Sequence, residues 1–399
     1  MNNSIFYKNI AVLCLAVALA LFFAGCAIKY PLERLSLSAY PGFADDMFYD
    51  GLEHSIQQSI AYLERVPEDR LFKFGDDAYP ASHMILSLEY FLDFIRGKPS
   101  KNDLKHFIQS NYLVYISTGR DKRGQVLFTG YYEPLLQGSL HANAEYNVPL
   151  FGLPNDLIEI DLAPFSPKYK GEKITGRLMD KTVVPYYDRS AIEGSEVLEG
   201  KADKLAWLKD PVDLFFLQIQ GSGKVFLDNG ETIRVHYHTT NGRPYRSIGK
   251  LLIDEGKIPR EAMSMQCIRA YLHNHPQEIE SVLNYNPSYV FFKIEEDGPL
   301  GCLNFKLTPG RSIALDRRIF PLPALAFIKT QKPLVNADGQ ICDWTDFSRF
   351  VLSQDTGGAI RGPGRADLFW GNGTYAEIAA GHMQHTGRLY FLVLKPEAL

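Results

Sequence analysis

The stretch 354–373 constrains the fold more than any other part of the chain. It reads QDTGGAIRGPGRADLFWGNG and holds two aspartates, Asp355 and Asp367, among glycines and a proline. Glycine at this density destabilises a helix and lets the backbone turn sharply and be approached closely. The stretch therefore predicts a rigid loop that presents a carboxylate to a bound molecule. The alternative is a solvated surface turn, but Phe369 and Trp370 directly after Asp367 would be unusual there.

The first residues indicate export. Lys8 precedes an apolar run that ends at Phe23, and small residues then lead to Cys26. This pattern is typical of a secretory signal peptide over 1–25, and the run is shorter than the ~18–20 apolar residues of a membrane-spanning helix. Small residues before a cysteine also resemble the lipobox of bacterial lipoproteins, which implies a lipidated Cys26 on the periplasmic face. Ala27 favours the outer membrane, whereas cleavage at a neighbouring bond without lipidation is the alternative.

Charge and cysteine content exclude several classes of protein. The net charge is −4 over 399 residues, which argues against nucleic acid as a partner. Of the five cysteines, one lies in the signal and Cys26 is the proposed anchor. The other three show no CxxC spacing, so neither a disulfide framework nor a zinc site is predicted. We expect no metal ion and no cofactor. The chain is long enough for two or three domains.

The spacing of apolar residues changes along the chain. Helical spacing runs over 49–116, and short β-rich runs bounded by glycine and proline follow, including 214–219. A helical interval covers 247–284, and strands return from 290 onward. The tripeptide DNG at 228–230 predicts a β-hairpin. Many short strands with such turns favour β-barrels decorated by helices.

Three aspartates are the candidate catalytic residues. Cleavage of a glycosidic bond needs a carboxylic acid that keeps its proton near neutral pH and protonates the leaving oxygen. Burial against an aromatic ring and a second carboxylate nearby both raise an aspartate pKa above ~3.9. Asp367 has this setting, Asp355 is its natural partner, and Asp316 is the third candidate. For Asp316 the alternative is a strand-end salt bridge with an arginine.

Side chains suited to sugars form a second group. Aromatic rings can stack on sugar rings while amides bind hydroxyls, although core packing is the alternative for each aromatic residue. Gln218 and Gln220 are expected to share one face of a strand. With the neighbouring glycines and hydroxyls, the candidate substrate-binding residues are Thr129, Tyr131, Tyr132, Glu133, Gln218, Gln220, Gly221, Ser222, Gly223, Gly357, Gly358 and Trp370.

Other catalytic patterns are incomplete. The sequence GSGK at 221–224 lacks the serine or threonine of a phosphate loop, because Val225 follows. His236 and His238 alternate on one strand face without a third ligand at metal-binding spacing. No serine lies in a Gly-x-Ser-x-Gly elbow.

Taken together, the motifs resemble the membrane-bound lytic murein transglycosylase A family. They occur in family order and cover about 125–395, and one departure is Pro-Leu-Pro at 321–323, where the family usually carries Pro-x-Gly. The matching segments are 128–134, 213–223, 263–266, 286–292, Asp316, 354–358 and 364–373.

The resemblance implies a mainly β fold with accessory helices. A double-psi β-barrel domain would comprise 46–136, with the N-terminal helices, and 294–399, with the catalytic aspartates. A second β-domain with helices would be inserted at 137–293, and a groove would lie between the two. Before them come the signal peptide, 1–25, and the lipidated N-terminus with its tether, 26–45.

The resemblance also implies an activity, that of a peptidoglycan lytic exotransglycosylase. Such an enzyme cleaves the β-1,4 bond between N-acetylmuramic acid and N-acetylglucosamine and leaves 1,6-anhydromuramic ends. Asp367 would act as acid and then as base, Asp355 would keep it protonated, and Asp316 would position the loop. Peptidoglycan strands are the expected partners, and complexes with murein synthases are compatible with the resemblance. The alternatives are a two-carboxylate glycoside hydrolase and a non-catalytic, expansin-like wall-binding lipoprotein.

Overall fold

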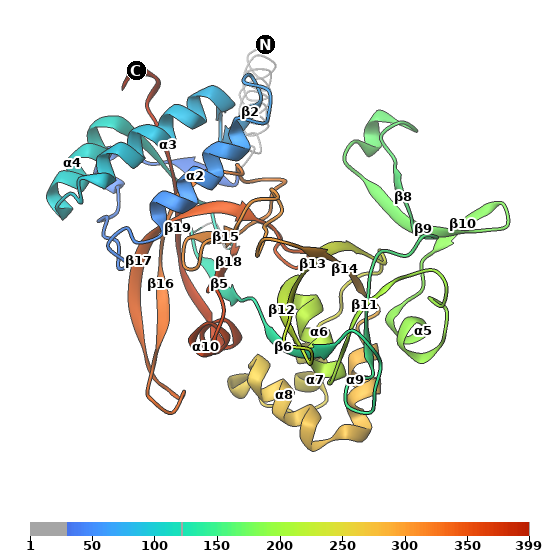
Figure 1. The fold of residues 1–399 in the computed structure, drawn as a ribbon. Helices are drawn as coiled ribbons and strands as arrows, with labels where there is room; N and C mark the ends of the chain where they lie inside the picture. Colours follow the sequence, from blue (N-terminus) through green and yellow to red (C-terminus); the bar gives the residue numbers. More distant parts are fainter. Residues whose placement is uncertain (1–29, 121–122, 399) are drawn as a thin grey trace, which may run out of the picture.

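The computed structural model describes residues 30–120 and 123–398, so the signal peptide and Cys26 lie outside the described residues. It shows two β modules, one carrying helices on its upper side in Figure 1 and the other carrying helices below. None of the helices in these ranges combines the length and apolarity that a bilayer crossing requires. The prediction of a mainly β fold with accessory helices is confirmed.

The first module is a closed six-stranded barrel. Its strands follow the order β19-β16-β17-β15-β18-β5, and β5 pairs with β19 again and closes the ring. The strand β19 can do this because its later residues pair with β16 and β4 while its first residues pair with β5. Two further strands, β1 and β4, extend the sheet beyond β19. The bounds are β1 (Leu32–Arg34), β4 (Tyr112–Ser117), β5 (Val126–Tyr131), β15 (Ser312–Ala314), β16 (Leu325–Val335), β17 (Ile341–Asp355), β18 (Arg365–Phe369) and β19 (Gln384–Leu394).

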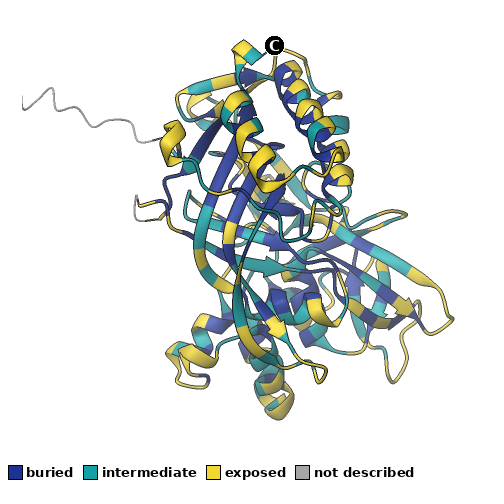
Figure 2. Cartoon of the chain, turned by 90° about the vertical axis from the view of Figure 1, so that its left-hand side faces the viewer, coloured by how far each residue is buried: buried dark blue, intermediate teal, exposed yellow. Residues whose placement is uncertain are grey.

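Amphipathic helices cover one side of the barrel. Each turns apolar residues inward and polar residues outward, so exposed and buried stretches alternate along them in Figure 2. Figure 1 shows them stacked above the barrel strands. A two-stranded hairpin lies between the first two. The bounds are α2 (Leu52–Leu63), β2 (Leu71–Phe74), β3 (Asp77–Pro80), α3 (Ala81–Arg96) and α4 (Lys101–Asn111).

The helical interval predicted over 49–116 is only partly correct. It is interrupted by the β2–β3 hairpin and ends in β4, whose residues are almost all buried. A short, continuously apolar run that is buried on both faces has no alternating pattern, so spacing alone does not separate it from a buried helix. The interval predicted as helical therefore ends in β4, a strand of the sheet that extends the barrel.

The segment predicted as a tether, 26–45, belongs to the fold from Leu32 onward. Leu32–Arg34 forms β1 and pairs antiparallel with β4. The side chain of Asp45 is buried and forms a bidentate ion pair with Arg311, at 2.6 and 2.8 Å, and Arg311 also donates to two backbone carbonyls. Because both ions are buried and fully hydrogen-bonded, this pair fixes the segment to the barrel.

The second module interrupts the barrel between β5 and β15. Its main sheet has the order β14-β13-β12-β6-β11-β7, and a smaller sheet, β10-β9-β8, projects to the right in Figure 1. The hairpin predicted at 228–230 is present, with Gly230 in the left-handed region. The sheet starts at Leu135 and ends at Glu295. The bounds are β6 (Leu135–Ser139), β7 (Val148–Phe151), β8 (Ile158–Asp161), β9 (Lys173–Met179), β10 (Thr182–Pro185), β11 (Lys204–Leu208), β12 (Ser222–Leu227), β13 (Thr232–Thr240) and β14 (Val290–Glu295).

The predicted strand at 214–219 is instead the helix α6 (Pro211–Gln220). The side chain of Asp210 caps its first turn, proline occupies the first helical position, and Gly221 ends it in the left-handed region. The helix is buried on most sides, so its apolar run lacks a polar face and resembles a core strand. The remaining helices are α5 (Arg189–Gly194), α7 (Ile248–Asp254), α8 (Met265–Asn274), α9 (Ile279–Asn284) and α10 (Thr374–His382).

Candidate active site

The barrel brings Asp355 and Asp367 together across one short strand. Ala314 of β15 pairs with Asp355 of β17 on one side and with Asp367 of β18 on the other. Neighbouring strands lie about 4.8 Å apart, so the two Cα atoms are roughly 10 Å apart. The stretch 354–373 is therefore not one loop, because both aspartates lie in strands and a glycine-rich turn joins them.

The strand β5 holds both carboxyl groups. The Thr129 hydroxyl donates to Asp367 Oδ1 at 2.6 Å, and the Tyr131 hydroxyl donates to Asp355 Oδ2 at 2.8 Å. Residues two apart on a strand share a face, so one strand edge presents both donors to the pair. Thr129 also lies opposite Asp367 in the parallel pairing of β5 with β18. The structure thus places two predicted substrate-binding residues directly against the aspartates.

The surroundings of the two carboxyls differ in the number of donors. Asp355 accepts from Tyr131 and also from the backbone N–H groups of Cys302 and Thr356, both at 2.8 Å. Asp367 accepts from Thr129 alone among the side chains and backbone groups with described bonds. Donors to a carboxylate stabilise its charged form, and Asp355 has three of them where Asp367 has one.

Burial raises the pKa of both aspartates. It raises the pKa of Asp355 to about 6, opposed by the three donors and reinforced by the charge of Asp367. It also raises the pKa of Asp367, opposed by the Thr129 hydrogen bond and the charge of Arg365. Both residues keep some contact with solvent. Burial of both carboxyls and the charge of Asp367 acting on Asp355 favour a proton on the pair at a higher pH than is ordinary for an aspartate.

The acidic pair lies where the chain passes between the two modules. Tyr131 ends β5, and the chain then enters the inserted module at Leu135. The returning segment, 296–311, contributes the Cys302 N–H to Asp355. These two connecting segments, the crossings at 131–135 and 296–311, therefore both contact the carboxyl of Asp355. Ligand sites occur preferentially at such domain junctions, where two rigid bodies can contact one ligand.

Asp316 does not join the pair directly. Its carboxyl is 1% exposed and accepts from the Arg318 guanidinium at 2.8 and 2.7 Å and from the Gly362 N–H at 2.9 Å. These interactions, led by the Arg318 hydrogen bond, lower the pKa of Asp316 to about 2. The salt bridge considered from the sequence is thus present, and a permanently charged Asp316 holds the turn that joins β17 to β18.

The two glutamines predicted to bind sugar have other partners. They lie on α6, so they do not share a strand face. Gln218 is buried, and its Oε1 accepts from Arg189 Nη2 at 2.5 Å. Gln220 is half-buried, and its Oε1 accepts from the backbone N–H of Tyr132 at 3.0 Å, which links the two modules.

Several predicted aromatic and polar contacts are buried instead. Trp370 is 8% exposed and packs against Phe347 and Tyr375, so its ring fills core space. Tyr132 is buried, and Glu133 is 1% exposed and contacts residues of both modules. Core packing, the alternative considered for each aromatic residue, describes the positions of Tyr132 and Trp370. Of the other candidates, Ser222 and Gly223 are buried, Gly221 and Gly357 are half-buried, and Gly358 is exposed.

Gln354 has a supporting role that the motif alone does not predict. Its buried side chain donates to Ser59 and to the Ser55 carbonyl on α2 and accepts from the Ser55 and Ser312 hydroxyls. The helical layer and β15 are thereby fixed to the residue before Asp355. A sequence signal exists, because Gln354 alternates with Asp355 on its strand and must face the core, where an amide needs partners.

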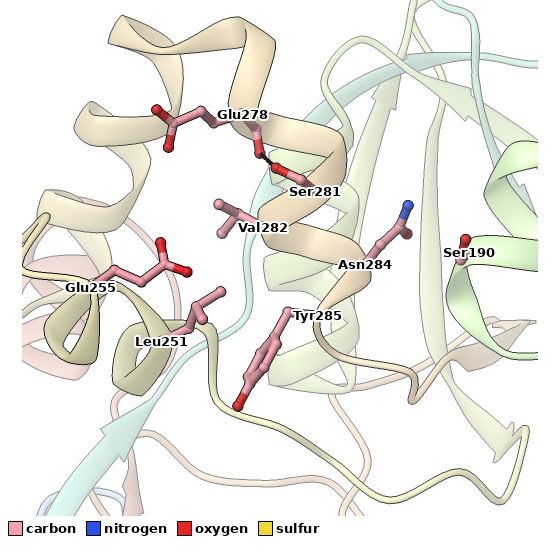
Figure 3. Close-up of a pocket in the computed structure, with 8 residues that line it drawn as sticks. All are labelled: Ser190, Leu251, Glu255, Glu278, Ser281, Val282, Asn284 and Tyr285. Atoms are coloured by element: carbon pink, nitrogen blue, oxygen red, sulfur yellow. Dashed lines mark hydrogen bonds between the residues drawn. The ribbon is translucent and has the colours of Figure 1, made fainter.

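Two hollows in the described part of the chain have other linings. One, of about 400 Å³, lies on the inserted module among α5, α7 and α9, with Ser190, Leu251 and Tyr285 in its wall (Figure 3). Another, of about 300 Å³, lies beside the turn that joins the two catalytic strands. Neither includes Asp355 or Asp367 in its lining, so hydrogen bonding and desolvation, not concavity, identify the acidic pair. No cluster of three metal-binding side chains occurs within 30–120 and 123–398.

Comparisons with known proteins agree with this architecture. Residues 127–293 match the MltA specific insert domain, and residues 311–393 match the 3D domain. The membrane-bound lytic murein transglycosylase A of Vibrio cholerae is 32% identical over 284 residues, covering 69% of this chain and 68% of that protein.

Solved structures show the same fold. The membrane-bound lytic murein transglycosylase of Agrobacterium tumefaciens has a TM-score of 0.74 and 28% identity, covering 92% of this chain and 99% of that one. Escherichia coli MltA, solved with bound chitohexaose, has a TM-score of 0.71 and 25% identity, covering 92% and 96%.

Barrel, insert and acidic pair define an enzyme of the lyase class, a lytic transglycosylase. The comparisons also identify the family within this class. The chain belongs to the membrane-bound lytic murein transglycosylase A family, as the identity over two thirds of a curated member shows.

Proposed function

We propose that the chain cleaves the β-1,4 bond between N-acetylmuramic acid and N-acetylglucosamine in peptidoglycan and forms 1,6-anhydromuramic ends. The observation that carries the proposal is the acidic pair, in which burial raises the pKa of Asp355 and of Asp367. Its relatives are named lytic murein transglycosylases, and the E. coli relative holds a chitohexaose, which supports a glycan strand as substrate. The glycan would lie across the junction of the two modules.

Asp367 acts first as the acid. Its proton passes to the glycosidic oxygen, the bond from that oxygen to the muramic anomeric carbon breaks, and positive charge grows at the carbon. The Asp367 carboxylate then accepts the proton of the muramic 6-hydroxyl, whose oxygen bonds to the anomeric carbon. Asp367 is thus protonated again at the end of the reaction, and no water is consumed. An intramolecular nucleophile has a high effective molarity, so a second catalytic carboxylate is not required.

Asp355 keeps the proton on Asp367. With a pKa of about 6 and three donors on its oxygens, Asp355 is mostly ionised at neutral pH. Its charge then disfavours ionisation of Asp367, which has a single donor. Asp316 acts at a distance, because it is bound to Arg318 and Gly362 and fixes the turn between the two catalytic strands.

The substitution Asp367→Asn tests the assignment. It keeps the shape and removes the proton that must be delivered, so soluble anhydromuropeptides should fall by at least about 10³-fold while glycan binding persists. Mass spectrometry of digested sacculi measures the products. Products heavier by one water per cut would instead indicate a two-carboxylate hydrolase, and undiminished anhydro products from Asp367→Asn would refute the role of Asp367.

We further propose that the enzyme is anchored by a lipidated Cys26 to the periplasmic face of the outer membrane. The support is the lipobox-like sequence before Cys26 and the alanine that follows it. Incorporation of a labelled fatty acid that is lost in Cys26→Ser tests the anchor. Labelling that survives this change would place the lipid elsewhere.

A further inference from the structure

The hollow of about 300 Å³ beside the catalytic strands is lined by three arginines. Arg120 follows β4, Arg361 lies in the turn after β17, and Arg365 begins β18. Between them the wall is built of glycine and proline backbone, which leaves room for a ligand. Three arginines around so small a space give it a positive charge.

These guanidinium groups have no carboxylate partner among the described side chains. Arg361 makes only long contacts, of 3.4 and 3.5 Å, with backbone carbonyls of its own turn. The Nε of Arg365 is buried and has no hydrogen-bond acceptor. Asp316, which binds the same turn, is already engaged by Arg318. Because a buried donor without an acceptor is unfavourable, the Nε of Arg365 favours an acceptor bound in the hollow.

The position of Arg120 is fixed by a glycine. A Cβ added at Gly364 would lie 2.5 Å from the Cβ of Arg120 and 2.6 Å from its backbone nitrogen. Only a glycine lets the two segments pack this closely, so the backbone of Arg120 rests directly on the turn that carries Arg361. The arrangement is therefore built into the fold and does not depend on a chance meeting of surface side chains.

The hollow continues the catalytic face of β18. Arg365 and Asp367 alternate with buried residues on this strand, so they share its accessible face about 7 Å apart along the chain. Their partners on β5 are Leu127, which also lines the hollow, and Thr129, which donates to Asp367. The charge of Arg365 reaches far enough to lower the pKa of Asp367. A substrate group bound in the hollow would thus belong to the sugar being cleaved or to its neighbour.

We propose that this hollow binds a carboxylate of the substrate next to the scissile bond, an inference that rests on the proposed function. Guanidinium groups match carboxylates in bidentate geometry. Muramic acid differs from N-acetylglucosamine by a lactyl group that ends in a carboxylate or continues as a peptide with carboxylates of its own. The hollow therefore selects muramic sugars over uncharged chitin-type sugars, whichever of the two carboxylates it takes.

Binding measurements with three ligands test the proposal. The mature chain carries Asp367→Asn, to prevent turnover, and Cys26→Ser, to remove the anchor. Arg120→Gln and Arg361→Gln are added singly and together, because both side chains are exposed and their loss leaves the core intact. The ligands are peptide-bearing glycan strands, strands stripped by an amidase so that the lactyl carboxylate is free, and chitohexaose. Arg260→Gln, an exposed arginine of the inserted module, is the matched control.

The double variant should bind one or both carboxylate-bearing ligands at least about tenfold more weakly, with chitohexaose unchanged. Weakening confined to stripped strands assigns the lactyl carboxylate, and weakening confined to peptide-bearing strands assigns the peptide. Equal effects on all three ligands, or none, would overturn the proposal. So would unchanged glycan binding with lost binding to phosphatidylglycerol vesicles, which would assign the arginines to a lipid headgroup.

The proposed function is tested by a separate measurement. It depends on anhydro products from the chain with Asp367 intact, irrespective of the arginines. If those products appear and the arginine variants show no selective loss, only the carboxylate site fails.

Discussion

Asp355 folds into surroundings that disfavour its charged form. Its pKa is raised to about 6 from 3.8, so the folded state binds this proton more tightly than the unfolded chain does. The associated stability is fully present below pH ~4 and is lost as the pH rises through 6. Asparagine does not titrate, so Asp355→Asn should be more stable than the parent at pH 8, by about 1–3 kcal/mol. Urea unfolding at pH 8 and pH 4 checks this, and the gain should vanish at pH 4. A variant that is less stable at both pH values would contradict it.

The pH dependence of activity separates a partner of the acid from a positioning residue. In the proposed mechanism the charge of Asp355 keeps the proton on Asp367, so Asp355→Asn should let Asp367 lose its proton more easily, and the loss of activity at alkaline pH should begin at a lower pH. Asp316→Asn weakens the hold of Asp316 on Arg318 and Gly362, so activity should drop about tenfold while the pH at which the alkaline loss begins stays the same. Rates of sacculus solubilisation from pH 4 to pH 9 distinguish the two. If the alkaline loss of activity shifted equally in both variants, the two aspartates would not have the different roles proposed for them.

Individual residue roles could be predicted unevenly. The three aspartates were accessible because acid chemistry, spacing and family motifs all point to them. The burial of Trp370 and Gln218 could not be predicted, because the sequence does not distinguish a ring or an amide that faces a sugar from one that faces the core. The donors that distinguish Asp355 from Asp367 include the backbone N–H of Cys302. A backbone donor cannot be predicted from the pattern of side chains in the sequence.

At the scale of elements, the strand β17 is joined to the helix α2 by Gln354. Replacing this buried amide by leucine leaves the hydroxyls of Ser55, Ser59 and Ser312 short of a partner. Gln354→Leu should therefore lower the free energy of unfolding by about 2–4 kcal/mol. Because Asp355 is the next residue, turnover well below the melting temperature should also fall. Gln340→Leu, at the exposed β16–β17 turn, is the control and should change neither quantity. Loss of stability with unaltered turnover would show that Gln354 does not position Asp355.

Element type was predictable where one face is buried and ambiguous where both are. The hairpin at 228–230 and the closing strand β19 followed from turn chemistry and β-rich runs. The strand β4 was predicted as helix and the helix α6 as strand, because both are apolar almost all round. For α6 the caps were decisive evidence, since Asp-Pro before the run and glycine after it mark helix ends.

At the scale of the whole molecule, barrel closure was not derivable from local patterns. It depends on strands separated by the inserted module, since β5 pairs with β18 and β19 of the C-terminal part. Only the family resemblance supplied this long-range pairing in advance. The junction that results carries the acidic pair, so the relation of the two modules bears directly on catalysis.

Glu133 is the side chain that couples the modules at this junction. It is buried, accepts from Asn372 of the barrel at 2.7 Å, and pairs with Lys224 of the insert at 3.3 Å. Glu133→Ala leaves both partners without their acceptor, so the free energy of unfolding should fall by about 2–3 kcal/mol. The loss should appear locally, as faster hydrogen exchange over 131–135 and 296–311. Turnover should fall with it, because those crossings also hold Asp355.

Glu231→Ala is the matched control for this change, since Glu231 lies at the exposed tip of the β12–β13 hairpin. It should leave exchange at the crossings and turnover as they are. The decisive comparison is between the two crossings of the Glu133 variant. If exchange rises over 131–135 and stays unchanged over 296–311, the crossings move independently and Glu133 fixes only the outgoing one. If both rise together, the modules shift as bodies, and the shape of the site at Asp355 depends on the packing between them.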